Sequence, residues 1–384
     1  MVTKYSQNVP VYFGNGAVKE LGDRVKELGC KKVMCVYDAG VKAAGASVKA
    51  EESLKAAGIE YVVYDKITAD PADYLVNECA TMAKEAGVDA FVGIGGGSSM
   101  DCAKAAAMLL DRELPIEQYF TAPPSFYKVS VPIILVPTTA GTGSECTTVA
   151  VISSGGAKPS VFVNTAMAVV DPELTYTVPA GVTANTGLDA FTHAAEALTA
   201  LKANPRSDLL AQSAIEKITK YLPIAVKEPT NAEARYNLAL ASNWAGIAFA
   251  DTDCHLGHCL ADGLSSAFHT PHGWNCILFD PQLMKLCAQA VPAKVAMVGI
   301  AAGADIAEDA TPDEIGAATA DAIYALMKAA GLKGPKSYNM DRTAFIEASK
   351  LCMDIDLGLR LNCPVEPTAE ICAEIYANAY DCYE

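Results

Sequence analysis

The chain has 384 residues, a formal net charge of −16, and 51% hydrophobic residues. So acidic a chain lacks the clustered Lys and Arg that bind nucleic acid or an anionic membrane, and neither is expected as a partner. No apolar run is long enough to cross a bilayer, and the 13 cysteines include no Cys-x-x-Cys pair. This composition favours a globular cytoplasmic protein with reduced thiols.

The first half of the chain alternates short apolar runs with alanine-rich stretches. Strands are expected at 32–37, 60–64, 90–94 and 132–136, and helices between them at 73–85 and 99–110. Such alternation predicts βαβ units and a parallel, Rossmann-like sheet in an α/β domain. Because the strands are almost continuously apolar, the sheet is expected to be covered on both faces.

After about Pro179 the β-like runs nearly vanish. Long helical patterns replace them at 186–201, 207–221, 232–250 and 315–330. A chain of this length usually exceeds one hydrophobic core, so two domains are expected. The sequence predicts an α/β domain over 1–180 and an all-helical domain over 181–384.

A glycine-rich turn, Gly95-Gly96-Gly97-Ser98, separates an expected strand from an expected helix. Glycines let the backbone approach a pyrophosphate, and the start of a helix offers free N–H groups. A tight turn without a ligand is the alternative, and the turn lacks the G-x-G-x-x-G fingerprint.

Asp38 ends the first of these expected strands. A carboxylate there can bind the ribose hydroxyls of an adenosine and would repel a 2′-phosphate, which favours NAD over NADP. A solvated carboxylate at a strand end is the alternative.

All five histidines fall between positions 193 and 272. Asp189 and His193 are four residues apart, so on a helix they share one face. His258 lies in a helical pattern and His272 in a Thr-Pro-His-Gly turn. One carboxylate and three imidazoles would suit Fe²⁺ or Zn²⁺ with an open position for substrate. Unrelated core or surface histidines are the alternative.

Three cysteines, Cys254, Cys259 and Cys276, flank these histidines. Cys259 follows His258 directly, about 100° around a helix, so it cannot easily share a metal with it. All three are expected to be small buried residues rather than ligands.

Five segments together resemble the iron-dependent (metal-containing, group III) alcohol dehydrogenase family, which has a dehydroquinate synthase-like fold. They are GGGSSMDCAK (95–104), PTTAGTGSE (137–145), DPELTYTVP (171–179), TGLDAFTHAAEA (186–197) and the TPHG segment that ends at 273. The resemblance covers essentially the whole chain.

The resemblance implies two cofactors, NAD(H) and Fe²⁺, with Zn²⁺ as an alternative metal. The implied metal ligands are Asp189, His193, His258 and His272. The implied cofactor-binding residues are Asp38, the turn Gly95, Gly96, Gly97 and Ser98, the nicotinamide-lining Thr138, Thr139, Thr142 and Val149, and Lys158 and Leu174.

The chain departs from the family pattern where many members have a second histidine that is proposed to relay a proton. Here that position is Asp262, which either relays the proton itself or orients a ligand imidazole, because it shares a helical face with His258. His269, in the loop before His272, is the other candidate for the relay. Val149 and Phe268 suggest an apolar pocket.

The resemblance therefore implies an NAD-dependent, metal-dependent alcohol dehydrogenase. It would act as an aldehyde reductase that transfers hydride between nicotinamide C4 and a small primary alcohol or aldehyde, as a homodimer or larger homo-oligomer. An ω-hydroxyacid dehydrogenase, for example one acting on 4-hydroxybutyrate, is an alternative that needs a cation near the metal. A dehydroquinate synthase-like lyase would need several basic residues there, and a non-catalytic metal-binding scaffold would bind no NADH.

Overall fold

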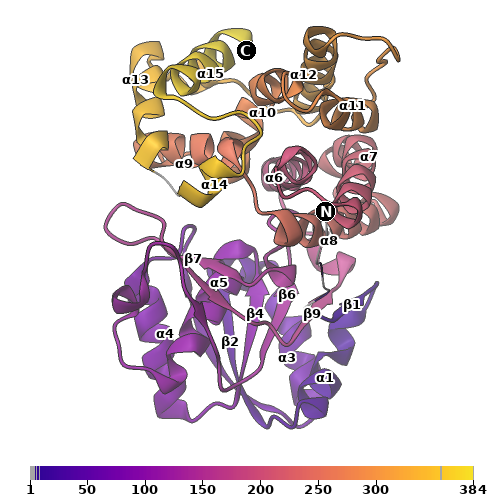
Figure 1. Ribbon diagram of the computed structural model, residues 1–384. Helices are drawn as coiled ribbons and strands as arrows, with labels where there is room; N and C mark the ends of the chain where they lie inside the picture. The colour runs from indigo at the N-terminus through magenta and orange to yellow at the C-terminus, as the bar shows by residue number, and fades with distance from the viewer. Residues whose placement is uncertain (1–4, 6, 8, 355–356, 384) are drawn as a thin grey trace. The chain divides into compact units, whose positions relative to one another are not determined.

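The computed structural model describes residues 5, 7, 9–354 and 357–383. The chain divides into two compact units, one spanning Gln7–Val178 and one that begins at Pro179. Figure 1 colours the first unit indigo to magenta and the helical unit rose to yellow. None of the described helices is both long and apolar enough to span a bilayer.

The first unit is built on a six-stranded sheet in which every neighbouring pair is parallel. The strand order is β1-β9-β6-β4-β2-β3. The strands are β1 (Val11–Phe13), β2 (Lys32–Asp38), β3 (Glu60–Ile67), β4 (Ala90–Gly95), β6 (Ile133–Pro137) and β9 (Met167–Val170). The predicted parallel sheet is confirmed. The short strands β1 and β9 escaped prediction because three or four residues show no clear period.

Both faces of this sheet are covered by helices, as the apolar strands predicted. Along β2, Val33 and Cys35 pack in one hydrophobic cluster, and Met34 and Val36 pack in another. The helices on the first side are α1 (Leu21–Glu27) and α3 (Ala46–Ala56), and those on the second are α4 (Asp73–Ala86) and α5 (Gly97–Met108) (Figure 1). Successive side chains point to opposite faces, so double coverage requires apolar residues at every position.

The strand order reverses between β2 and β4. From β2 the chain runs outward to β3, and it then returns to add β4 and β6 on the other side. Val36 of β2 pairs with Gly93 of β4, so the carboxyl ends of these two strands lie side by side. Ligands of open α/β sheets bind at such a reversal.

The described residues of the second unit form helices and the loops between them, with no strand. Its helices are α6 (Ala180–Thr199), α7 (Pro205–Lys227), α8 (Ala232–Thr252), α9 (Leu256–Phe268), α10 (His272–Ala288), α11 (Pro292–Ala301), α12 (Pro312–Ala329), α13 (Arg342–Glu347), α14 (Leu357–Leu361) and α15 (Ala369–Cys382). Helix α6 packs against α7, α8 and α10, and α10 also packs against α9. The predicted all-helical character is confirmed.

Helix α10 approaches α6 so closely that only glycine fits at the contact. A Cβ on Gly273 would lie 2.1 Å from the carbonyl oxygen of Asn185 and 2.9 Å from Cβ of Asp189. Both neighbours belong to α6, and one is backbone that cannot swing away. The contact therefore sets the distance between two helices that both carry residues of the histidine cluster.

We expect Gly273→Ala to destabilise the helical unit by about 1–3 kcal/mol, because the added methyl overpacks this contact. Gly181→Ala is the matched control on α6, since a Cβ there meets nothing within 4 Å. Urea unfolding followed by tryptophan fluorescence measures both variants. Equal stability of Gly273→Ala and wild type would contradict the proposed packing.

Candidate metal centre

Three helices of the second unit bring the predicted ligands together. Asp189 and His193 lie on α6, His258 on α9, and His272 is the first residue of α10. His193 Nδ1 lies 4.0 Å from Asp189 Oδ2, and His272 Nε2 lies 3.8 Å from Asp189 Oδ1. The ring of His258 is 4.8 Å from that of His193 and 5.6 Å from that of His272, between centroids. Residues far apart in the sequence thus form one cluster.

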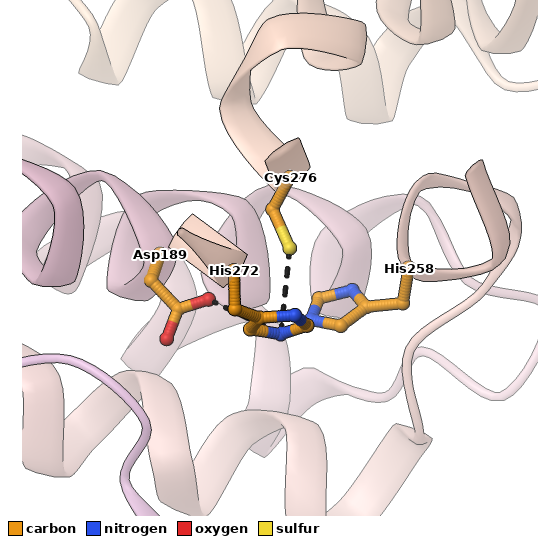
Figure 2. Close-up of side chains that lie close together, drawn as sticks. All are labelled: Asp189, His258, His272 and Cys276. Atoms are coloured by element: carbon orange, nitrogen blue, oxygen red, sulfur yellow. Dashed lines mark hydrogen bonds and ion pairs between the residues drawn. The ribbon is translucent and has the colours of Figure 1, made fainter. Parts of the chain in front are cut away.

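The cluster has the donor atoms of a metal site. Asp189, His258, His272 and Cys276 each offer one ligand atom, and these atoms all lie within 4.8 Å of one another (Figure 2). A second, overlapping set joins His193 and His258 to a cysteine, Cys254. Both cysteines are buried, as expected, and their thiols lie beside the donor atoms of the cluster.

A buried carboxylate that sequence analysis missed, Glu196, orients His258. Glu196 is fully buried, and its Oε1 accepts a hydrogen bond from His258 Nδ1 at 2.6 Å. Its Oε2 accepts one from the backbone N–H of His255 at 2.5 Å. With Nδ1 occupied, His258 presents Nε2, which is buried without a hydrogen-bond partner among the described residues. A carboxylate that fixes the tautomer of a ligand histidine in this way is usual at metal sites.

The spacing on α6 could have revealed this residue. Asp189, His193 and Glu196 stand at positions i, i+4 and i+7, so they lie on one helical face. A buried face of α6 thus carries two carboxylates and an imidazole.

Burial shapes the protonation of both carboxyls. Removal from water raises the pKa of Asp189 to about 6. Burial also opposes ionisation of Glu196, but the facing imidazoles of His258 and His255 hold the pKa of its carboxyl below the usual value. Buried carboxylates without a compensating cation are unfavourable, so the donor set fits a divalent metal.

Asp262 and His269, the two predicted proton-relay residues, are placed differently. Asp262 Oδ1 lies 3.9 Å from His272 Nδ1, so it faces His272, whereas the partner of His258 is Glu196. His269 is exposed at the C-terminal end of α9, with φ 53°. None of the contacts described for His269 joins it to the cluster. Their roles stay predictions.

An aromatic side chain not foreseen from the sequence borders the cluster. The ring of Phe249, on α8, stacks on that of His193 with centroids 4.4 Å apart and is half-buried. Phe268, which was expected to shape an apolar pocket, has its ring centroid 6.3 Å from that of Phe345, and its role stays a prediction. Phe249 is therefore an apolar neighbour of His193.

The first unit brings the glycine turn and the predicted threonines together. Thr138 N–H donates to Gly95 O at 2.9 Å. A Cβ on Gly96 would lie 3.4 Å from Thr139 Oγ1, and one on Gly97 would lie 3.0 Å from Thr142 Cγ2. The turn and the threonine loop are therefore in contact, and a Cβ at Gly97 would force Thr142 to shift.

The local conformation of this turn also requires glycine. Gly95 has φ +151°, and a Cβ there would lie 2.7 Å from Ser99 Oγ. Helix α5 begins at Gly97, and no side chain caps its first turn. Its leading N–H groups, next to Ser98, are therefore available to an anion.

The other predicted cofactor residues lie at several places in the first unit. Asp38 ends β2, and its Oδ1 accepts a hydrogen bond from Val41 N–H at 2.9 Å. Lys158 Nζ pairs with Asp70 at 3.1 Å. Leu174 is buried in the 3-10 helix η5 (Pro172–Thr175), and Val149 starts strand β7 (Val149–Val151).

A buried lysine that sequence analysis did not single out holds the threonine loop against α5. Lys104 is fully buried, and its Nζ donates to the carbonyl and hydroxyl oxygens of Ser144 and to Val149 O, each at 2.7 Å. Asp101, one turn earlier, accepts from Ser144 Oγ at 2.6 Å and from Val151 N–H at 3.1 Å. Burial lowers the pKa of Lys104 and raises that of Asp101. The pair supports the loop structurally.

Comparison with known proteins identifies the family. Residues 8–172 match the family described as iron-containing alcohol dehydrogenase. Residues 183–380 match the C-terminal region of the Fe-containing alcohol dehydrogenase family. The chain therefore belongs to the iron-containing alcohol dehydrogenase family, which confirms the resemblance seen in its motifs.

Individual relatives show how the family varies. The chain is 39% identical over 265 residues to an NAD-dependent methanol dehydrogenase of Bacillus methanolicus, covering 68% of this chain and 69% of the relative. It is 37% identical over 270 residues to a sulfoacetaldehyde reductase of Bilophila wadsworthia, with 68% and 69% covered. These oxidoreductases act on chemically different small molecules.

Solved structures match almost the whole chain. A 1,3-propanediol oxidoreductase superposes with a TM-score of 0.92 at 28% identity, covering 99% of this chain and 100% of the other. A sulfoacetaldehyde reductase from Bifidobacterium kashiwanohense, solved in complex with NAD⁺, superposes with a TM-score of 0.88 at 30% identity and covers 99% of each chain. The fold is thus that of these oxidoreductases.

We expect Lys104→Met to destabilise the first unit by about 3–5 kcal/mol, because it leaves Asp101 buried without its cation and strips a donor from two carbonyls. Hydrogen–deuterium exchange should also become faster over residues 138–151. Lys49→Met, at an exposed position on α3, is the matched control and should change neither quantity. Wild-type protection of the loop in Lys104→Met would show that Lys104 does not anchor it.

Proposed function

We propose that this protein is an NAD-dependent, metal-dependent alcohol dehydrogenase that works as an aldehyde reductase on small primary alcohols and aldehydes. The observation that carries the proposal is the cluster of Asp189, His193 and His258, which are buried, with the half-buried His272, in a chain of the iron-containing alcohol dehydrogenase family. Two of its donor atoms, Asp189 Oδ1 and His258 Nε2, are buried with no hydrogen-bond partner among the described residues.

In this proposal Asp189, His193, His258 and His272 hold Fe²⁺, with Zn²⁺ as the alternative. A divalent cation in such a site acts as a Lewis acid that stabilises negative charge on the substrate oxygen. Glu196 keeps His258 in the tautomer that binds metal. Phe249, stacked on His193, offers an apolar contact to a small carbon chain.

The first unit binds NAD(H) in this proposal. The pyrophosphate lies on the uncapped start of α5, at residues 95–98, where glycines let the backbone come close. Asp38 binds the adenosine ribose, because it ends β2 beside the turn at the point where the strand order reverses. Its negative charge favours NAD over NADP.

The remaining cofactor contacts follow from the loops packed around the turn. The nicotinamide half is lined by Thr138, Thr139, Thr142 and Val149, and Lys158 and Leu174 make further contacts. A relative that is named NAD-dependent and a similar structure in complex with NAD⁺ support the same cofactor.

Asp262 carries the proton between the site and solvent, with His269 as the second candidate. The observation that favours Asp262 is its position 3.9 Å from His272 Nδ1, whereas His269 is exposed at a helix end. Carboxylates can serve as general acids and bases when they lie within reach of the reacting group.

We place the protein in the cytoplasm as a homodimer or larger homo-oligomer. Each of the described cysteines is a free thiol, which is typical of a reducing compartment. Sedimentation velocity on the purified protein tests the assembly, and a monomer would contradict it.

The activity is tested with protein stripped by a chelator and reloaded anaerobically with Fe²⁺ or Zn²⁺. We expect NADH oxidation that requires the metal, prefers NADH to NADPH, and is fastest with short uncharged aldehydes. A preference for aldehydes that carry a carboxylate or sulfonate would favour the ω-hydroxyacid alternative. Metal and NADH binding without turnover would point to lyase chemistry, and no NADH binding at all to a non-catalytic scaffold.

Glu196→Gln tests the support of the metal. Glutamine has one carbonyl oxygen for two N–H donors, so either His258 or the His255 backbone loses its acceptor. We expect about 10–100-fold weaker binding of the metal with the fold retained. Equilibrium dialysis with Zn²⁺ measures the affinity, and Glu216→Gln, at an exposed position on α7, is the control. Unchanged affinity in Glu196→Gln would rule out the orienting role.

A further inference from the structure

A buried thiol lies among the donor atoms of the candidate metal centre. Cys276 is on α10, four residues after His272, so the two side chains share one face of the helix. Its side chain is completely buried, and Sγ is 3.5 Å from His272 Nε2. Figure 2 shows the thiol and the imidazole of His272 pointing toward each other.

The donor atoms around Cys276 indicate that its contact with His272 is part of a ligand site and not only side-chain packing. His258 Nε2 and Asp189 Oδ1 are both buried without a hydrogen-bond partner among the described residues. One ligand atom of His258 and one of Asp189 lie within 4.8 Å of Cys276 Sγ. Nitrogen, carboxylate oxygen and sulfur atoms that converge in this way match the donors of first-row divalent metals.

We propose that Cys276 is a further, thiolate ligand of the metal, in addition to the carboxylate and the imidazoles. The proposal rests on the metal centre assigned under the proposed function. On binding, the S–H bond breaks, sulfur forms a bond to the divalent ion, and the proton passes to solvent; no electrons are transferred. A thiolate favours Zn²⁺, Co²⁺ and Fe²⁺ over the harder Mg²⁺ and Mn²⁺.

The geometry selects Cys276 over the neighbouring thiols. Cys254 belongs to a smaller set that contains His193 and His258 but neither the carboxylate of Asp189 nor His272. Cys259 follows His258 directly and therefore points about 100° away around α9. Cys276 alone of these three shares a donor set with Asp189.

Co²⁺ substitution tests the proposal without relying on turnover. Thiolate-bound Co²⁺ shows a strong sulfur-to-metal charge-transfer absorption in the near ultraviolet, and imidazole- or carboxylate-bound Co²⁺ does not. We expect the band in the Co²⁺-loaded wild type, its loss in Cys276→Ser, and its retention in Cys254→Ser and Cys259→Ser. Each sample is checked for bound Co²⁺ and for its circular dichroism spectrum.

Zn²⁺-loaded wild type gives a second readout that does not depend on how any variant folds. X-ray absorption at the zinc edge should show one sulfur scatterer at about 2.3 Å. A zinc shell of nitrogen and oxygen alone would overturn the proposal, and so would a charge-transfer band that persists in Cys276→Ser. Wild type that binds neither Co²⁺ nor Zn²⁺ would instead refute the metal centre itself.

Discussion

The arrangement of the histidine cluster depends on one buried carboxylate, Glu196. Its two oxygens accept hydrogen bonds from the backbone of His255 and the ring of His258, so α6 is tied to the start of α9. A fully buried carboxylate is stable only when both oxygens are satisfied, which leaves these partners little freedom. Because Nδ1 of His258 is held by Glu196, Nε2 is left buried without a hydrogen-bond partner among the described residues.

Close packing supplies the rest of the constraint. Helix α10 brings His272 and Cys276 to the cluster because Gly273 lets it touch the backbone of α6 at Asn185. The spacing of residues along α10 then decides which donor atoms reach the cluster. Because His272 and Cys276 stand one turn apart on α10, the packing that brings one side chain to the cluster also brings the other.

The first unit also relies on a buried charge that makes several hydrogen bonds. Lys104 donates hydrogen bonds to the carbonyls of Ser144 and Val149, which could not otherwise be buried without cost. The carboxylate of Asp101 compensates the positive charge of Lys104. The loop lies against the glycine turn, where Thr138 N–H donates to Gly95 O. In each unit one buried ionic residue, Glu196 or Lys104, positions its neighbours through hydrogen bonds.

The sequence by itself determined the fold class and the family, and it predicted four metal ligands. Continuous apolar runs predict strands covered on both faces, and helical periodicity predicts long helices. The four-residue spacing of Asp189 and His193 predicts that both side chains lie on one face of a helix. Only the tertiary structure decided which carboxylate serves which imidazole. Glu196 rather than Asp262 holds His258, and Cys276 joins the cluster although its sequence context resembles ordinary core. Such contacts join α6, α9 and α10 across dozens of residues, and local periodicity carries no information about the distances between packed helices.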